Sequence, residues 1–81
     1  MKITYTDYAE DTIADRKLDK IIIEDALLNP DEIVEGKKNR KIAHKIINDK
    51  LLRVIYEIED KAYIVVTAYF AEIERYFGKW K

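Results

Sequence analysis

Two side chains suited to phosphate chemistry, Arg53 and His44, are predicted to face each other across neighbouring strands. A guanidinium group presents a planar fork of donors that matches phosphate oxygens. An imidazole exchanges a proton near neutral pH, so His44 is a candidate general base. Each residue also has a structural interpretation, with Arg53 paired to Glu57 or another acid and His44 as a hydrogen-bonded strand residue. The sequence leaves these alternatives open.

A basic segment leads up to Arg53. Residues 37–53 contain seven basic residues and His44 against one acid, whereas residues 7–35 contain ten acids against three basic residues. The side chains suited to binding a nucleic-acid backbone are Lys37, Lys38, Arg40, Lys41 and Lys45. The alternative is a solvated strand edge, where lysines discourage pairing with another sheet. Because the formal net charge is −1, any anion-binding surface must be local.

The hairpin that positions Arg53 is predicted over residues 51–69, where β-branched and aromatic residues are interrupted by Glu59-Asp60-Lys61. With Asp60 and Lys61 in the turn, the predicted pairs are Tyr56–Val65, Val54–Thr67 and Arg53–Ala68. Strand alternation predicts a core face of Leu52, Val54, Tyr56, Ile58, Tyr63, Val65 and Thr67. The opposite face, here called the open face, receives Leu51, Arg53, Ile55, Glu57, Ile64, Val66 and Ala68.

A second hairpin positions His44. Residues 40–47 alternate basic and apolar residues, and Asn48-Asp49 suits a two-residue turn. That turn sets His44 opposite Arg53 and Ile42 opposite Ile55, on the open face. A slip of one residue would send all of these side chains to the other face.

The N-terminal part of the chain predicts a strand over residues 2–6 and two helices. Asp7 and Glu10 resemble a capping box for the first helix. Asp19 begins the second helix, and Asn29-Pro30 ends it, because proline disfavours helical geometry in the residue before it. Residues 31–35 form a brief predicted strand.

This order of elements predicts an α+β fold in a single domain over residues 1–81. A short N-terminal strand precedes two helices, which pack on one face of a three- to four-stranded antiparallel sheet. The C-terminal segment carries Tyr76, Phe77 and Trp80, and it is expected to dock as a short helix or a strand. These aromatic rings either pack against the domain or stack on bases.

The composition limits the cellular setting. The chain lacks cysteine, which removes disulfides and thiolate metal sites and fits a reducing compartment. The N-terminal sequence MKITYTDY is too polar for a signal peptide, and no apolar run approaches the ~18 residues of a membrane span. A cytoplasmic protein without a membrane partner, a metal or a cofactor is expected.

Several stretches resemble a small uncharacterised prokaryotic family that is related to the RelE/ParE-like toxin superfamily and lies near the BrnT toxins. They are ITYTDYAEDTIADRKLDKIIIEDALLNPDEI, LLRVIYEI and YIVVTAY, which together span most of the chain. The most distinctive parts are LLNPDE, R-V-I-Y and V-V-T-x-Y. The resemblance implies a RelE/ParE toxin-like fold and a toxin of a toxin–antitoxin pair. Such toxins are metal-free mRNA endonucleases or translation inhibitors, which act on the ribosome or on free RNA.

The resemblance also implies roles for particular residues. Arg53 matches the arginine that stabilises phosphate charge, and Tyr76 matches a tyrosine that assists attack by the 2′-hydroxyl. Lysines on the preceding strand of those toxins match Lys41 or Lys45 by position, and Lys41 and Lys45 are expected to position RNA. Two departures stand out: Phe70-Ala71-Glu72 replaces a second basic residue, and Tyr8 replaces a histidine of the nearer relatives.

A non-catalytic interaction module is the alternative. The open face carries the aliphatic side chains Ile42, Ile46, Leu51, Ile55, Ile64 and Val66. Such a face suits a homodimer, another oligomer or an antitoxin bound through the sheet. The two interpretations are compatible, because toxins of this type are masked by a partner protein.

Overall fold

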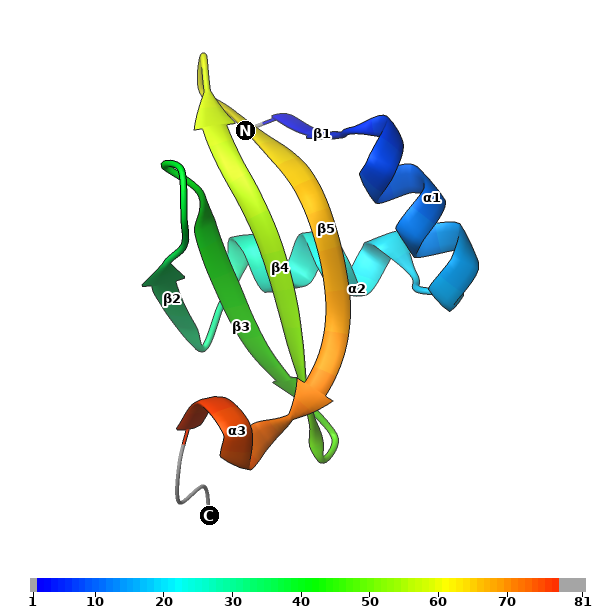
Figure 1. Ribbon diagram of the computed structural model, residues 1–81, viewed down its shortest axis with the longest axis vertical. Coiled ribbons are helices and arrows are strands. Elements are labelled where there is room, and N and C mark those ends of the chain that lie inside the picture. Colours follow the sequence, from blue (N-terminus) through cyan, green and yellow to red (C-terminus); the bar gives the residue numbers. More distant parts are fainter. Residues whose placement is uncertain (1, 78–81) are drawn as a thin grey trace.

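The chain builds one twisted sheet with helices packed against it, and the computed structural model describes residues 2–77. The strands are β1 Lys2–Tyr5, β2 Glu32–Glu35, β3 Lys41–Ile47, β4 Lys50–Glu59 and β5 Ala62–Glu72. The helices are α1 Asp7–Arg16, α2 Lys20–Leu28 and α3 Ile73–Phe77. Figure 1 shows α1 and α2 beside and behind the sheet, with α3 at its lower end.

The predicted α+β class is confirmed, but the predicted sheet is wrong in strand number and direction. Across residues 2–77 the sheet has five strands in the order β1-β5-β4-β3-β2. The N-terminal strand β1 joins the sheet as an edge and runs parallel to β5, whereas the other pairs are antiparallel. Local alternation identifies a strand but not a partner some sixty residues away, so the position of β1 was not predictable.

Helices α1 and α2 each begin at a short polar side chain that caps the helix. The Thr6 hydroxyl accepts a hydrogen bond from the Ala9 amide at 3.0 Å, so Thr6 caps α1, and the prediction of Asp7 is wrong by one residue. Asp7 instead occupies the first turn, where a carboxylate is stabilised by the helix dipole. The predicted cap Asp19 is confirmed, because its carboxylate accepts from the Ile21 amide at 2.9 Å.

The hydrophobic core lies between the two helices and one face of the sheet. The helices contribute Ala9, Ile13, Ile23, Ala26 and Leu27, and the sheet contributes Ala43, Leu52, Val54, Tyr56, Val65 and Ala68. The contacts of α1 with β5 and of α2 with β3 and β4 place both helices on this face. The prediction of two helices on one face of the sheet is therefore confirmed.

The β4–β5 hairpin follows the predicted register only up to its middle. Asp60 and Lys61 form the turn with φ of 53° and 62°, and Tyr56 pairs with Val65 as predicted. A β-bulge then adds one residue to β5, since Ile55 pairs with Thr67. The predicted pairs Val54–Thr67 and Arg53–Ala68 are consequently wrong.

The bulge exchanges the faces of the residues that follow it. Ala68 pairs with Val54 and is fully buried in the core, although it was predicted on the open face. Thr67 pairs with Ile55 on the open face, although it was predicted in the core. Tyr69 becomes the partner of Arg53.

The β3–β4 hairpin has the predicted register. Ile42 pairs with Ile55, and His44 pairs with Arg53. Asn48 in the turn has φ of 59°, a geometry that asparagine adopts readily. Arg53 therefore lies on the open face, away from α1 and α2.

The C-terminal segment is a strand followed by a short helix. β5 continues to Glu72, and α3 then turns back so that Ile73 is buried and Tyr76 contacts Arg53 and His44. Trp80 and the side chain of Phe77 lie outside the described residues. No helix within residues 2–77 is long and apolar enough to cross a membrane.

Candidate functional site

Arg53 is held from two sides on the open face. Its Nε donates a hydrogen bond to Nε2 of His44 at 3.0 Å, and its Nη1 donates to the hydroxyl of Tyr69. Among residues 2–77 no carboxylate forms an ion pair with Arg53, because Glu57 pairs with Arg40 instead. The guanidinium is thus oriented by neutral neighbours and remains partly exposed.

His44 is the buried support of this arginine. It is 2% exposed, and its Nδ1 lies 3.0 Å from a carboxylate oxygen of Glu32. Because Nε2 accepts a hydrogen bond from Arg53, Nδ1 must carry the hydrogen of the neutral ring and donate a hydrogen bond to Glu32. The contacts therefore assign the Nδ1–H tautomer. Both ring nitrogens are engaged, which leaves neither directed at a substrate.

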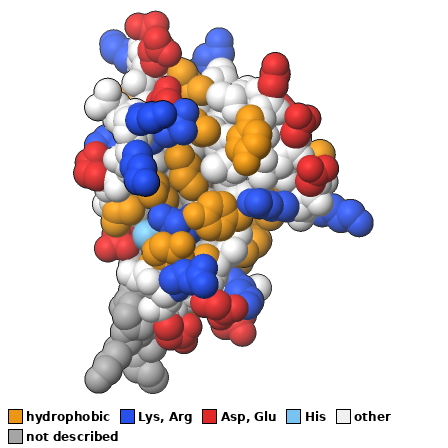
Figure 2. Space-filling model, viewed as in Figure 1, with side chains coloured by type: hydrophobic (Ala, Val, Ile, Leu, Met, Phe, Trp, Pro, Cys, Tyr) orange, Lys and Arg blue, Asp and Glu red, His pale blue; other side chains and the backbone are white. Residues whose placement is uncertain are grey.

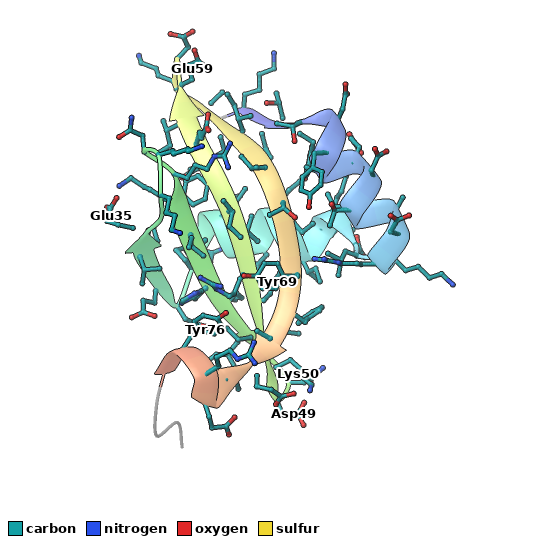
Figure 3. All side chains as sticks on the ribbon, in the orientation of Figure 1. Glu35, Asp49, Lys50, Glu59, Tyr69 and Tyr76 are labelled. Atoms are coloured by element: carbon teal, nitrogen blue, oxygen red, sulfur yellow. The ribbon has the colours of Figure 1, made fainter. Side chains whose placement is uncertain are left out.

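Two tyrosines complete the cluster around Arg53. The guanidinium carbon lies 3.9 Å from the ring centroid of Tyr76 and 5.5 Å from that of Tyr69. The Tyr76 ring also lies 5.7 Å from the imidazole of His44. Stacking of this kind attracts a cation to the face of an aromatic ring. Figure 3 shows Tyr69 and Tyr76 coming from β5 and α3 to the same end of the sheet.

The two phenols differ in acidity. For Tyr76, loss of hydration acts to raise the pKa, but the positive charge of Arg53 and hydrogen bonds with Tyr69 and Arg75 outweigh it, so the pKa of Tyr76 is lowered. For Tyr69, burial is the largest influence and exceeds the opposing attraction of Arg53, so the pKa of Tyr69 is raised. Tyr76 is therefore the phenol of this pair that loses its proton more readily.

Sequence reasoning missed two members of this cluster. Glu32 faces His44 through the β2–β3 pairing, but the sequence predicted β2 without its partner. Tyr69 faces Arg53 only because of the bulge, which alternation does not reveal. For Glu32 a signal did exist: its strand ends a few residues before the strand of His44, as in a hairpin.

Part of the predicted basic cluster borders a hollow on the same face. Lys37, Lys38 and Arg40 line a cavity of about 320 Å³ together with Gly36, Ile42 and Ile55. Arg40 is paired with Glu57 at 2.9 Å. Figure 2 shows this face of the molecule, with cationic side chains above and below an apolar strip.

The remaining lysines of the cluster lie on the other face. Lys41 pairs with Glu35 at 2.8 Å. Lys45 donates to the carbonyl of Asn29 at 2.8 Å and lies 3.7 Å from Asp25 of α2. Strand alternation places both side chains on the helical side, so the structure does not bring them to Arg53.

The site can therefore bind an anion beside an ionisable phenol. The oriented guanidinium of Arg53 supplies donors, Tyr76 supplies a group that can exchange a proton, and the hollow supplies further positive charge. Within the described part of the chain, no three His, Cys, Asp or Glu residues are placed to share a metal ion.

Comparison with known proteins identifies a family. Residues 5–70 match the family described as "Domain of unknown function (DUF4258)", a match that covers most of the chain and includes Arg53, His44, Glu32 and Tyr69. No curated protein and no solved structure matches. The chain belongs to the DUF4258 family.

Proposed function

We propose that this protein is the toxin-like component of a toxin–antitoxin pair and that it cleaves mRNA without a metal ion. The observation that carries the proposal is the setting of Arg53. Its guanidinium is fixed by His44 and Tyr69, stacks on Tyr76 and stays partly exposed on a sheet face that α1 and α2 leave uncovered. Such a pre-oriented donor stabilises charge that develops on a phosphate.

The chemistry assigns one step to each side chain. The phenolate of Tyr76 takes the proton of a 2′-hydroxyl, and the 2′-oxygen attacks the adjacent phosphorus. The bond from phosphorus to the 5′-oxygen breaks, and water supplies the proton that this oxygen takes up. The products are a 2′,3′-cyclic phosphate and a 5′-hydroxyl. Arg53 stabilises the negative charge on the phosphoryl oxygens throughout.

His44 and Glu32 act in this proposal as positioning residues. The general-base role predicted for His44 is reassigned to Tyr76, because His44 is buried and uses both ring nitrogens. A base must reach the proton that it removes. Lys37 and Lys38 bind the RNA backbone, whereas Arg40 is paired with Glu57 and Lys41 and Lys45 lie on the opposite face.

The proposal includes a place in the RelE/ParE-like superfamily, near the BrnT toxins. Two helices on one face of a sheet in which β2 to β5 are antiparallel, and the R-V-I-Y sequence on β4, support it. The proposed compartment is the cytoplasm, where mRNA and ribosomes are found and where a chain without cysteine is suited to reducing conditions. The proposed partner is an antitoxin that covers the open face.

Expression in a bacterial host tests this proposal. Induction of the parent should arrest growth and generate mRNA fragments, and co-expression of the neighbouring open reading frame should relieve the arrest. Arg53→Ala should restore growth, because removal of one oriented donor typically costs about 10²- to 10³-fold in rate. Lys61→Gln, at the far hairpin tip, is the matched control. Arrest that is equally strong with Arg53→Ala would contradict the proposal.

A second candidate is an interaction module without catalysis. It is favoured by aliphatic side chains that remain partly exposed on the open face, namely Ile42, Ile46, Ile55, Ile64 and Val66. Sheet faces with such apolar strips often bind a partner. Sedimentation at high protein concentration should then show a dimer. A strict monomer that captures no partner in pull-down experiments would exclude this candidate.

A further inference from the structure

We infer that the hollow beside the β2–β3 loop is a nucleotide subsite, which receives the base and phosphate next to the phosphate bound at Arg53. This inference rests on the proposed function and deepens it. The hollow has a volume of about 320 Å³, an apolar floor formed by Ile42 and Ile55, and a rim that carries Lys37 and Lys38. The aliphatic floor offers apolar contact to a flat base, and the cationic rim offers charge to a phosphate.

The position of the hollow relative to Arg53 supports this assignment. Ile55 follows Arg53 by two residues on β4, so both side chains lie on the open face about 7 Å apart along the strand. Ile42 and His44 have the same relation on β3, and the register pairs Ile42 with Ile55 and His44 with Arg53. The hollow and the guanidinium of Arg53 therefore lie next to each other along the direction of β4. A single RNA strand that follows β4 meets both.

The charges around the hollow indicate an anionic occupant. Glu57 neutralises Arg40 at 2.9 Å. Lys37 and Lys38 are exposed, and among the residues that the structure describes neither takes part in an ion pair. Other lysines of the chain, such as Lys41 and Lys50, are paired with carboxylates. The two lysines at the rim thus remain available to phosphate oxygens.

The loop geometry keeps the rim in place. The backbone of Arg40 lies close to Gly36. The Gly36 amide donates a hydrogen bond to the Arg40 carbonyl oxygen at 2.8 Å, and a Cβ added at Gly36 would lie 3.1 Å from the same oxygen. Lys38 and Asn39 have φ of 56° and 64°. This tight turn holds the two lysines over the end of the sheet.

Binding of a non-cleavable RNA tests the subsite. The probe is a fluorescein-labelled single strand whose 2′-hydroxyls are methylated, and anisotropy is followed against salt concentration. The double variant Lys37→Gln with Lys38→Gln should bind about tenfold more weakly at low salt. The slope of log affinity against log salt should fall by about 1.4, because each phosphate contact contributes about 0.7 for a single strand.

The matched control is Lys17→Gln with Lys61→Gln. These lysines are also exposed, so the net charge changes by the same amount, and Lys17 with φ of 55° matches Lys38 with φ of 56°. The control should bind the probe like the parent. Ile55→Thr should weaken binding of the probe. The slope of log affinity against log salt should stay unchanged, because this substitution alters the floor of the hollow and not its charge.

Three results would overturn the inference. If Arg53→Ala abolishes RNA binding and the lysine pair variant binds like the parent, the subsite is wrong while the proposed function stands. If the parent does not bind RNA, both fail. In a competition experiment, unlabelled RNA should displace the probe from the parent protein. If inorganic polyphosphate, or an acidic peptide of glutamate and leucine, displaces the probe equally well, the hollow does not select a nucleotide.

Discussion

The cluster around Arg53 shows how neighbours determine what one side chain can do. His44 holds the Nε side of the guanidinium, Tyr69 holds one terminal nitrogen, and the Tyr76 ring lies beneath it. Lysine could not replace Arg53, because a single ammonium group cannot reproduce the planar fork of donors of the guanidinium. Glu32 affects Arg53 indirectly, because it fixes the tautomer of His44. The sequence identified Arg53, His44 and Tyr76, but not the contacts that orient them.

The tautomer of His44 is the first prediction. His44 is the only histidine of the chain, so its ¹⁵N resonances can be assigned without ambiguity. The contacts require hydrogen on Nδ1 and a lone pair on Nε2. Glu32→Gln should preserve this tautomer, because an amide oxygen also accepts, whereas Glu32→Ala should increase the Nε2–H form. A parent spectrum of the Nε2–H tautomer would contradict the account.

The alkaline titration of the tyrosines is the second prediction. The pKa of Tyr76 is lowered, so its ionisation stabilises the fold above the pKa of an unfolded tyrosine, and this contribution is lost as pH falls through the folded pKa. The pKa of Tyr69 is raised, so its contribution is present at lower pH and is lost as pH rises.

The earliest step in tyrosinate absorbance should therefore belong to Tyr76. It should disappear in Tyr76→Phe and move to higher pH in Arg53→Gln, where the attracting charge is absent. Tyr8→Phe, on the exposed face of α1, is the control and should leave this step in place. An unchanged first step in Tyr76→Phe would show that another phenol titrates first.

At the level of elements, local patterns predicted most of the fold. Alternation and turn residues predicted both hairpins, and the cap at Asp19 and the Asn29-Pro30 pair predicted the limits of α2. The parallel pairing of β1 and the bulge in β5 were not predictable. The first depends on residues far apart in the chain, and the second depends on how β5 bends over the helices. The bulge matters for the site, because it exchanges Ala68 for Tyr69 opposite Arg53.

Neighbouring substitutions in β5 form the third prediction. Ala68 is fully buried against the core, so Ala68→Leu should overpack it and lower the free energy of unfolding by about 1–3 kcal/mol. Thr67 faces the open side, so Thr67→Leu should change that free energy by less than about 0.5 kcal/mol. Urea unfolding measures both. The opposite order would mean that the strand follows the unbulged register.

The start of α1 gives the fourth prediction. Thr6 accepts from the Ala9 amide, so Thr6→Ala should lower the free energy of unfolding by about 1 kcal/mol. Asp7→Ala should lower the free energy of unfolding by less than Thr6→Ala does, because Asp7 contributes only its charge in the first turn. If Asp7→Ala costs more than Thr6→Ala, the cap lies at Asp7 after all.

The whole molecule has two different faces. The helices α1 and α2 carry more acidic than basic residues and cover one face, while Arg53 and the lysine-rimmed hollow lie on the other. A near-neutral net charge therefore conceals a local cationic surface. The uneven distribution was predicted from the sequence, but Lys41 and Lys45 fall on the helical side, so only part of the basic segment contributes to that surface.

Cleavage of RNA in a purified system tests the central claim most directly. The protein is incubated with free mRNA and with mRNA on translating ribosomes, and the fragment ends are determined. The account predicts 2′,3′-cyclic phosphate ends from the parent and from Lys61→Gln, with the rate reduced by about 10²- to 10³-fold in Arg53→Ala. Fragments produced as rapidly by Arg53→Ala, or no fragments from the parent in either setting, would contradict it.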